Sequence, residues 1–416
     1  MKDSGISWVG EIPKEWTIMP LYCFYSERKN KNIFGAENNL LSLSYGKVIR
    51  KDINTSEGLL PSNYNGYNIV EAGDIIIRPT DLQNDKRSLR TGLSKERGII
   101  TSAYIALKPK NGINSRFYHY LLHTYDILKV FYNMGNGVRQ GLNYDEFAKL
   151  MVYSPSDTEQ QRIAEFLDRE CGKIDGLKAD IQAQIDTLEQ YKRSVITEAV
   201  THGLNPSAPM KDSGAGWMPL IPLHWKADKL KFHLRQRGIK NQIDKQVLSL
   251  YREYGIVPKD SRDDNHNVTS EDVSDYRYVR VGDFVVNKMK AWQGSVAVSN
   301  YEGIVSPAYF VYEFSDDLIN KRYFHYLMRN KTYATEFRRL SGGIREGQWD
   351  LPSEALNNTI ILLPPLDEQQ EIADYLDNKC AEIEQIITEK KTQIETLDAY
   401  KKSLIYEYVT GKKEVV

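Results

Sequence analysis

Apolar residues recur every seven positions along two long stretches of the chain. The first stretch carries this repeat on Leu167, Ile174, Ile181, Leu188 and Val195. The second carries it on Leu376, Ile383, Leu397 and Leu404. A seven-residue repeat keeps one apolar stripe facing a partner helix, which is typical of a coiled coil. We therefore predict two helices of about 45 residues each, or about 65 Å at about 1.5 Å per residue.

Polar residues at the ends of the two stretches indicate where the helices begin and end. "PSDTEQQ" and "PLDEQQ" each place a proline before an acidic or hydroxyl residue, with carboxylates in the first turn. "THGLNPSAP" and "TGKK" are typical of helix ends and linkers. These signals place the two helical segments at residues 156–204 and 365–416.

The whole chain repeats itself with a shift of 209 residues. The shift pairs "MKDSGISWVGEIPKEW" with "MKDSGAGWMPLIPLHW", and "EAGDIII" with "RVGDFVV". Across the helical segments about twenty of about forty positions are identical. Chance similarity does not reach this density, so the chain is two copies of one unit, each a globular part followed by a helix.

The globular parts, residues 1–155 and 205–364, have a mixed pattern. "NNLLSLSYGKVI", "DIIIRP" and "GIITSAYIALKP" are short and rich in β-branched and aromatic residues, which predicts strands. "SRFYHYLLHTYDILKVFYN" has the spacing of a helix. We expect two similar α/β domains. Because the nearest partner for each apolar stripe is the other helix, we expect an antiparallel coiled coil with pseudo-twofold symmetry.

Composition narrows the class of protein. With 416 residues and 41% hydrophobic content, the chain can bury more than one core. Three cysteines do not make a disulfide framework, which favours a reducing compartment. The start "MKDSGISWVG" is not an apolar leader, and no run of about 18 apolar residues is present. We expect a cytoplasmic protein with no membrane partner.

Charge is divided unevenly along the chain. The net charge is −1, yet the two helical segments together carry about −9, so the globular parts carry about +8. Basic domains gain affinity for phosphate by releasing counterions from nucleic acid. The partition therefore favours a nucleic-acid partner for the globular parts.

Polar loops after the shared Gly-Asp motif are the first candidate DNA-binding sites. They offer donors for phosphates and for base edges. In the first copy the candidates are Arg78, Lys86, Arg87, Arg90, Lys95 and Arg97. In the second they are Asn287, Lys288, Lys290, Trp292 and Gln293. A plain exposed loop is the alternative, but one scaffold with two loop chemistries is what two readers of different sequences would show.

Two glycine-rich stretches, "GNGVRQGL" and "SGGIREGQW", are the second candidate. Glycine lets backbone approach a ligand closely, and a neighbouring polar side chain can then hold a phosphate or a guanine edge. The candidates are Arg139, Gln140, Arg345 and Gln348. A glycine turn whose arginine bonds its own domain is the alternative.

Motifs for catalysis are weak or missing in the sequence. The chain has no Walker loop, and "GNGVRQG" does not have dinucleotide-binding spacing. His119 and His123 are four residues apart, as zinc ligands can be, but the second copy keeps only His325 and has Arg329 in the other place. We expect structural histidines, no metal and no catalytic residue.

The chain resembles the specificity (S) subunit of type I restriction-modification enzymes over nearly its whole length. The resemblance lies in "GWMPLIPLHW" and its twin, "ILLPPLDEQQEIADYLD" entering the helix, "LIYEYVTGK" leaving it, and "GGIREGQ". The first copy departs in "MVYSPSDTEQQ", which has one proline where the second has two. The resemblance implies two target recognition domains, each reading one half of a split DNA site, with the helix pair setting the gap.

The resemblance also implies partners that supply all catalysis. These are two modification (methyltransferase) subunits, which bind S-adenosylmethionine, and restriction (motor and nuclease) subunits, which use ATP and Mg²⁺. This chain would then be a non-enzymatic, DNA-binding subunit with no cofactor of its own. Two hypotheses compete with this interpretation: a DNA methyltransferase with its own catalytic site, and a coiled-coil adaptor that binds no DNA.

The repeated "EQQ" near each helix start is the candidate contact with a modification subunit. We expect it to be exposed, with simple helix capping as the alternative. The residues are Glu159, Gln160, Gln161, Glu368, Gln369 and Gln370.

Overall fold

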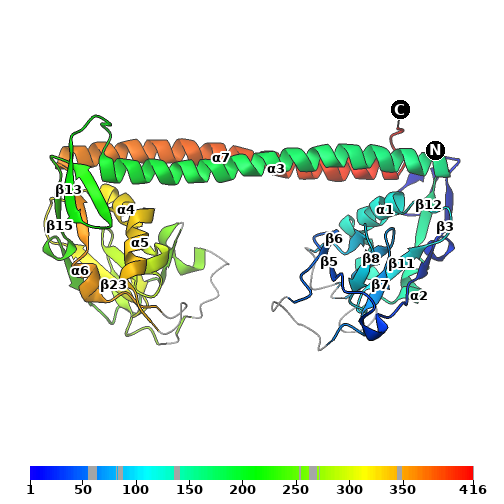
Figure 1. The fold of residues 1–416 in the computed structure, drawn as a ribbon, viewed down its shortest axis with the longest axis horizontal. Helices are drawn as coiled ribbons and strands as arrows, with labels where there is room; N and C mark the ends of the chain where they lie inside the picture. Colours follow the sequence, from blue (N-terminus) through cyan, green and yellow to red (C-terminus); the bar gives the residue numbers. More distant parts are fainter. Residues whose placement is uncertain are drawn as a thin grey trace. The chain divides into compact units, whose positions relative to one another are not determined.

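The computed structural model describes residues 1–54, 63–80, 82, 88–134, 141–252, 254–261, 269–270, 272–343 and 349–415. The chain divides into two compact units: residues 1–181 with 392–416, and residues 182–391. The division crosses both long helices, α3 (Asp157–His202) and α7 (Leu366–Val409). Each unit therefore holds one globular part and a section of each helix, and the two predicted long helices are confirmed (Figure 1).

The first unit is built on antiparallel strands. Its other elements are β1 (Lys2–Asp3), β2 (Glu11–Ile12), β3 (Thr17–Pro20), η1 (Leu21–Cys23), β4 (Tyr25–Glu27), η2 (Ile33–Gly35), β5 (Leu41–Ser44), β6 (Lys47–Arg50), β7 (Asn68–Val70), β8 (Ile75–Ile77), β9 (Thr91–Leu93), β10 (Gly98–Ile100), β11 (Ile105–Pro109), α1 (Ser115–Ile127), η3 (Val130–Asn133), α2 (Tyr144–Phe147) and β12 (Met151–Ser154). The central sheet has the order β4-β11-β8-β9, and the pairs β1–β2, β3–β12, β5–β6 and β7–β10 accompany it.

The second unit repeats this plan. Its other elements are β13 (Met210–Ala215), β14 (Met218–Pro222), β15 (Lys226–Lys229), η4 (Leu230–Phe232), β16 (Leu234–Arg237), β17 (Leu248–Tyr251), β18 (Gly255–Pro258), η5 (Lys259–Ser261), β19 (Arg277–Val279), β20 (Phe284–Asn287), η6 (Ala291–Gln293), β21 (Val296–Val298), β22 (Gly303–Val305), β23 (Tyr309–Phe314), α4 (Lys321–Arg329), α5 (Lys331–Leu340), α6 (Ser353–Asn357) and β24 (Ile360–Leu363). Its central sheet has the order β16-β23-β20-β21, which matches the first strand for strand. The predicted pair of similar α/β domains is confirmed.

Alternation along the central strands gives the first unit two cores. Ile75 and Ile77 of β8 join the larger core, which contains Phe117 of α1. Ile76 points to the other face and packs with Val70 and its neighbours from the hairpin strands. Successive strand residues face opposite sides, so one strand serves both layers. Strand β20 divides its side chains in the same way in the second unit.

Within the first unit, α3 and α7 run in opposite directions. The Nζ of Lys401 lies 2.6 Å from Oδ1 of Asp175. Three residues further along α3, Lys178 pairs with Asp398, three residues earlier on α7. Because the residue numbers of successive contacts rise along α3 and fall along α7, the two helices are antiparallel.

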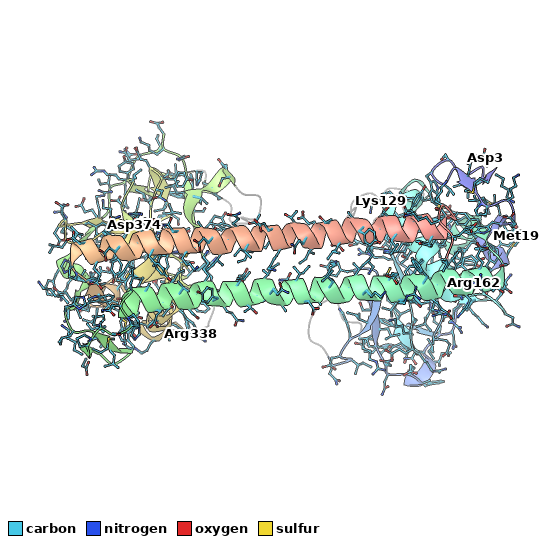
Figure 2. All side chains as sticks on the ribbon, turned by 90° about the horizontal axis from the view of Figure 1, so that it is seen from above. Asp3, Met19, Lys129, Arg162, Arg338 and Asp374 are labelled. Atoms are coloured by element: carbon cyan, nitrogen blue, oxygen red, sulfur yellow. The ribbon has the colours of Figure 1, made fainter. Side chains whose placement is uncertain are left out.

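The second unit contains an antiparallel pair of its own. Lys192 pairs with Glu384, and the Nζ of Lys390 lies 2.5 Å from Oε1 of Gln184. Figure 2 shows side chains of the two helices meeting along their facing sides. The heptad residues on these sides are buried or half-buried, and Cys171 and Cys380 sit among them as free thiols.

The two units differ where the helix after the central sheet ends. The predicted helix of the first unit stops at Ile127, because Lys129 adopts a left-handed conformation with φ of 61°. In the second unit the helical path continues beyond this point as α5. The side chain of Asn330 makes this possible by accepting from the first N–H groups of α5.

Candidate nucleic-acid interface

The two predicted loops of the first unit meet at the end of β8. The Leu142 N–H donates to the Pro79 carbonyl, with 3.0 Å between N and O. The Arg78 N–H donates to the Arg90 carbonyl at 2.8 Å. The polar loop and the segment after the glycine-rich stretch therefore share one edge of the sheet. Outside the described residues lie Lys86, Arg87, Arg139 and Gln140.

The second unit joins its loops at the same positions of the repeat. The Leu351 N–H donates to the Lys288 carbonyl at 2.9 Å, and the Asn287 N–H donates to the Ser295 carbonyl at 3.1 Å. The two loop candidates of each copy, far apart in the sequence, thus belong to one surface in each unit. Outside the described residues lie Arg345 and Gln348.

A tight turn adds a third segment to this surface in the second unit. In "SPAYF" the Tyr309 N–H donates to the Ser306 carbonyl at 3.0 Å. The Lys288 N–H then donates to the Ala308 carbonyl at 3.2 Å. This stretch is therefore a structural turn beside the loops.

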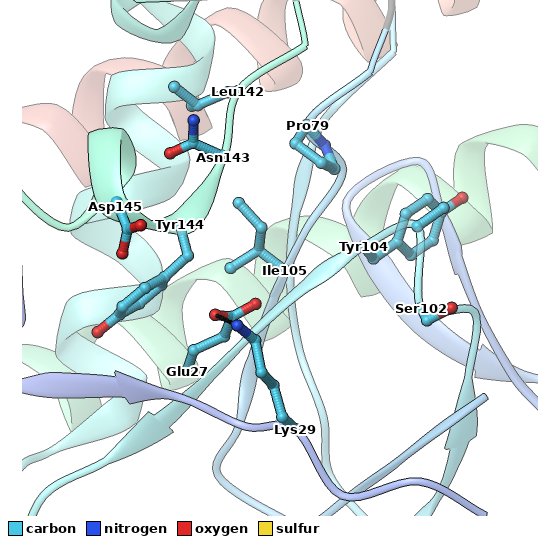
Figure 3. A pocket seen from close by; sticks show the side chains of 11 residues that line it. Glu27, Lys29, Pro79, Ser102, Tyr104, Ile105, Leu142, Asn143, Tyr144 and Asp145 are labelled. Atoms are coloured by element: carbon cyan, nitrogen blue, oxygen red, sulfur yellow. Dashed lines mark ion pairs between the residues drawn. The ribbon is translucent and has the colours of Figure 1, made fainter. Parts of the chain in front are cut away.

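A hollow of about 270 Å³ adjoins the meeting point in the first unit (Figure 3). Pro79 and Leu142 line it together with Tyr104 from the equivalent turn. Glu27 and Lys29 face one another across its rim, with 2.7 Å between carboxylate oxygen and ammonium nitrogen. The hydrogen bond that Lys29 donates to Glu27 raises the pKa of Lys29 and keeps it charged. The hollow thus offers polar groups and a cation next to the loops.

Arg90 lies inside the first unit, which corrects its expected place in an exposed loop. Its side chain is fully buried, and Nη1 donates to the Thr80 carbonyl at 2.5 Å. Its backbone N–H is bound by the buried carboxylate of Asp126, whose pKa burial raises to about 6. The guanidinium satisfies carbonyl groups at the start of the loop, a demand that the local sequence does not reveal.

The remaining described candidates of the first unit are at least partly accessible. Arg97 is exposed and paired, with Nε 3.0 Å from a carboxylate oxygen of Glu37 and Nη1 2.7 Å from one of Glu71. Lys95 is exposed and Arg78 is half-buried. A phosphate near Arg97 would compete with two carboxylates.

The candidates of the second unit divide into supporting and surface residues. Asn287 is buried, and its Oδ1 accepts from the Met289 N–H at 3.1 Å, which shapes the loop. The Nζ of Lys288 lies 2.9 Å from a carboxylate oxygen of Asp350. Fully at the surface are Lys290 and Gln293.

Trp292 belongs to a cluster that sequence reasoning did not find. Its ring centroid lies 5.5 Å from that of Trp349, and the guanidinium carbon of Arg338 lies 5.9 Å and 5.7 Å from the two rings. Arg338 comes from α5, outside both loops. The tryptophan directly after "GGIREGQ" was the one signal in the sequence that pointed here.

The Gly-Asp motif that precedes both loops anchors them to the sheet. The Nη2 of Arg28 lies 2.9 Å from Oδ1 of Asp74, and Arg237 pairs with Asp283 at the same positions of the second copy. Burial raises the pKa of Asp74, while the hydrogen bond from Arg28 opposes that rise. The repeated aspartate is therefore a support for the loops.

The glutamate of each "EQQ" repeat bonds a buried tryptophan of its own unit. The indole N–H of Trp16 donates to Glu159 at 3.0 Å, and that of Trp225 donates to Glu368 at 3.1 Å. Both tryptophans are almost fully buried. The motif thus ties the start of each long helix to the globular part beside it.

The expectation that the whole repeat is exposed is wrong for its first glutamine. Gln160 and Gln369 are only 2% and 1% exposed. Their side-chain amides donate to the carbonyl groups of Pro155 and Pro364, just before each helix, at 3.0 Å and 2.9 Å. These bonds supply partners for carbonyl groups near the buried start of each helix. Gln161 and Gln370 are exposed and bond the capping asparagines of α1 and α4.

The histidine pair is buried in the first unit. Burial lowers the pKa of His119 to about 3 and that of His123 to about 4, so both are neutral near pH 7. Among the described residues, no group of three or more His, Cys, Asp and Glu side chains is placed to hold a metal ion. None of the helices in that part of the chain is long and apolar enough to cross a membrane.

Known proteins share this architecture and sequence. The chain is 26% identical over 344 residues to the "Type I restriction enzyme MjaVIII specificity subunit" of Methanocaldococcus jannaschii, covering 77% of this chain and 75% of that protein. A chain of a solved type I R-M system aligns over 97% of this chain and 100% of its own length, with a TM-score of 0.65 and 13% identity. The HsdS subunit from Thermoanaerobacter tengcongensis aligns over 99% and 100%, with a TM-score of 0.49 and 13% identity.

The family comparison covers both copies of the repeat. The family described as "Type I restriction modification DNA specificity domain" matches residues 27–187 and again residues 239–396. The two matches include three of the four strands of each central sheet, both loop surfaces and most of both long helices. The chain therefore belongs to the type I restriction-modification DNA specificity family.

Proposed function

We propose that each unit of this DNA specificity subunit reads one half of a bipartite, asymmetric target. One observation carries the proposal: the same edge of the same sheet presents different side chains in the two units. Lys29 is exposed beside this edge in the first unit, and Lys290 and Trp292 lie there in the second. Different donors on equivalent backbone predict different half-sites.

In this proposal the long helices set the gap between the half-sites. Helix α3 has 46 residues, or about 69 Å at about 1.5 Å per residue. An antiparallel partner in each unit stiffens it. The bond from Trp16 to Glu159 fixes the start of α3 to the globular part of the first unit, and the bond from Trp225 to Glu368 fixes the start of α7 to that of the second. Adding one heptad to each of α3 and α7 should lengthen the unread gap and leave the half-site bases unchanged. A gap of unchanged length would refute the spacing role.

The same helices would carry the catalytic partners. Among the exposed apolar side chains on them, two pairs are equivalent at the shift of 209: Leu177 with Ile386, and Tyr191 with Tyr400, all 41–55% exposed. An apolar position exposed in both copies supports docking of two copies of one partner. We assign these positions to the two modification subunits, with restriction subunits joining that core.

The proposal gives this chain no reaction of its own. S-adenosylmethionine would bind to the modification subunits, and ATP and Mg²⁺ to the restriction subunits. The support is chemical, since the carboxylates of Glu27, Asp74 and Asp283 near the loops are engaged in ion pairs. Purified chain mixed with labelled S-adenosylmethionine should retain no label, whereas retention would favour a methyltransferase with its own site. Assembled complex without affinity for DNA would favour an adaptor.

Exchange of one recognition part tests the central claim. Residues 21–150 would be replaced by the matching residues of a relative that methylates a different target. The methylated site should change in one half only, because each unit reads alone. A matched exchange of residues 230–359 should change the other half, and a change in both halves from either exchange would contradict the proposal.

A further inference from the structure

The second unit contains two indole rings and a guanidinium group packed against one another. Trp292 comes from η6, and Trp349 is the last residue of the glycine-rich stretch "SGGIREGQW". Arg338 comes from the last turn of α5. The rings are tilted by 59° at a centroid distance of 5.5 Å. The guanidinium carbon of Arg338 is within 6 Å of both centroids, at 5.9 and 5.7 Å, which is the range of cation–π attraction.

The cluster is held from three sides by the fold. The indole N–H of Trp292 donates to the Met289 carbonyl at 3.0 Å, so that ring is fixed to its own loop. Phe337, next to Arg338, is fully buried and anchors α5 in the core. Asp350, next to Trp349, bonds Lys288. These supports limit the directions in which Arg338 can point.

The position of the cluster is at the loop surface of the second unit. Leu351 donates to the Lys288 carbonyl two residues beyond Trp349, and Lys288 lies four residues before Trp292. Both indoles are half-buried and Arg338 is exposed. A cluster that only filled a core would be covered, whereas this one presents its edges where the polar loops converge.

The geometry points to Arg338 as the residue that reads a guanine in the half-site of the second unit, with Trp292 and Trp349 as positioning residues. Arginine can donate two parallel hydrogen bonds to O6 and N7 of guanine in the major groove. That readout needs a guanidinium plane of fixed direction, which stacking on aromatic rings supplies. A phosphate contact carries no such demand, because a flexible cation satisfies it equally well. This inference rests on the proposed function.

The sequence of the first copy has no counterpart of the two tryptophans. Neither the loop of residues 79–89 nor the stretch "GNGVRQGL" contains a tryptophan. The cluster therefore belongs to the part of the scaffold in which the two copies diverge. It predicts a guanine requirement that is specific to one half-site.

The test uses the complete modification complex and a set of DNA duplexes. Each position of the second half-site would be varied in turn, and the methylation rate measured for wild-type chain and for Arg338→Ala, Arg338→Lys and Trp349→Ala. Loss of a bidentate contact lowers discrimination against the wrong base by about 10- to 100-fold. We expect this loss at one G·C pair in the Arg338→Ala and Arg338→Lys variants, and a smaller loss in Trp349→Ala. Lys331→Ala, which removes one charge from the start of α5, is the matched control and should keep full discrimination.

Each other outcome overturns the inference. Unchanged discrimination in Arg338→Ala would remove its role. An equal loss on all duplexes, restored by Arg338→Lys, would identify a phosphate contact instead. A second half-site without any G·C requirement in the wild type would also refute it. Failure of the proposed function is distinguishable, because exchange of residues 230–359 would then leave the methylated site unchanged. Thermal unfolding of each variant separates misfolding from altered readout, and Arg338→Gln replaces any variant that does not fold.

Discussion

The two units have the same strand order and the same supports, yet they differ at the edge of the sheet where the loops meet. Asp74 with Arg28 and Asp283 with Arg237 repeat one bonded pair behind the loops. In front of this pair, the first unit buries Arg90 below its loop, whereas the second places Trp292 at the surface. Duplication has preserved the bonds that hold the loops and allowed their tips to diverge, as two readers of different half-sites require.

The buried tryptophans give the strongest test of equivalence between the units. Trp16→Ala and Trp225→Ala each remove a buried indole and its hydrogen bond to the start of a long helix. We expect each to lower the free energy of unfolding by about 3–5 kcal/mol. Denaturant titration of each variant measures this. The half-buried Trp292→Ala is the control and should cost much less, and a mild effect of only one core variant would show that the supports are unequal.

Acid should destabilise the first unit more than the second. His119 and His123 of the first unit have pKa values of about 3 and about 4, and His325 of the second has a pKa of about 4, all lowered by burial. His119 and His123 face one another, and Lys401 and Lys402 face His123. Unfolded imidazoles bind protons below a pH of about 6.5, so the unfolded state is favoured as the pH falls from there toward the folded pKa values.

The expected slope is about 1.4 kcal/mol per pH unit for each such imidazole. The first unit, with two, should therefore lose more stability than the second, with one, and proton uptake by folded Asp126, whose pKa is about 6, offsets part of this difference. Hydrogen exchange of α1 and α4 at pH 7 and at pH 4.5 compares them. His123→Gln should bring the two responses together, and faster opening of α4 in the wild type would contradict the account.

Mutation of the ion pairs between the long helices should change stability least, and the change should be nearly equal in the two units. Asp175 with Lys401 in the first unit corresponds to Glu384 with Lys192 in the second at the shift of 209. Such exposed pairs contribute about 0.2–1 kcal/mol. Lys192→Glu and Lys401→Glu should each cost about this much by repulsion, and adding Glu384→Lys to Lys192→Glu should restore stability. Thermal unfolding checks this, and the absence of restoration would show that the pair does not form.

The repeat, the two long helices and the α/β class could be predicted because their signals extend over many residues. A heptad repeat and a constant repeat spacing can be recognised even where a few positions depart from the pattern. The sequence around Tyr45 and Gly46 predicts one continuous strand, but in the structure these two residues form the turn between β5 and β6. Turns of this kind depend on two residues only.

Burial of single polar groups could not be predicted. Arg90 and Gln160 look like surface residues by type, and both bond carbonyl groups that only the folded backbone brings near. Arg338 could not be predicted either, because the two tryptophans that it contacts, Trp292 and Trp349, come from two other segments of the chain. The predicted segments do meet at one edge of the sheet in each unit, whereas their role in DNA binding stays a prediction.

The two ends of the chain are joined by contacts in the first unit. The Nζ of Lys412 lies 2.8 Å from the Glu11 carbonyl oxygen, and the Tyr406 hydroxyl lies 3.4 Å from the Trp8 carbonyl oxygen. The second unit has continuous backbone, residues 203–209, at the corresponding place. Residues near the start and the end of the sequence thus contact one another within the first unit, so a circular permutant cut within 203–209 should keep both units intact. Which globular part is translated first is then incidental to the target that is recognised.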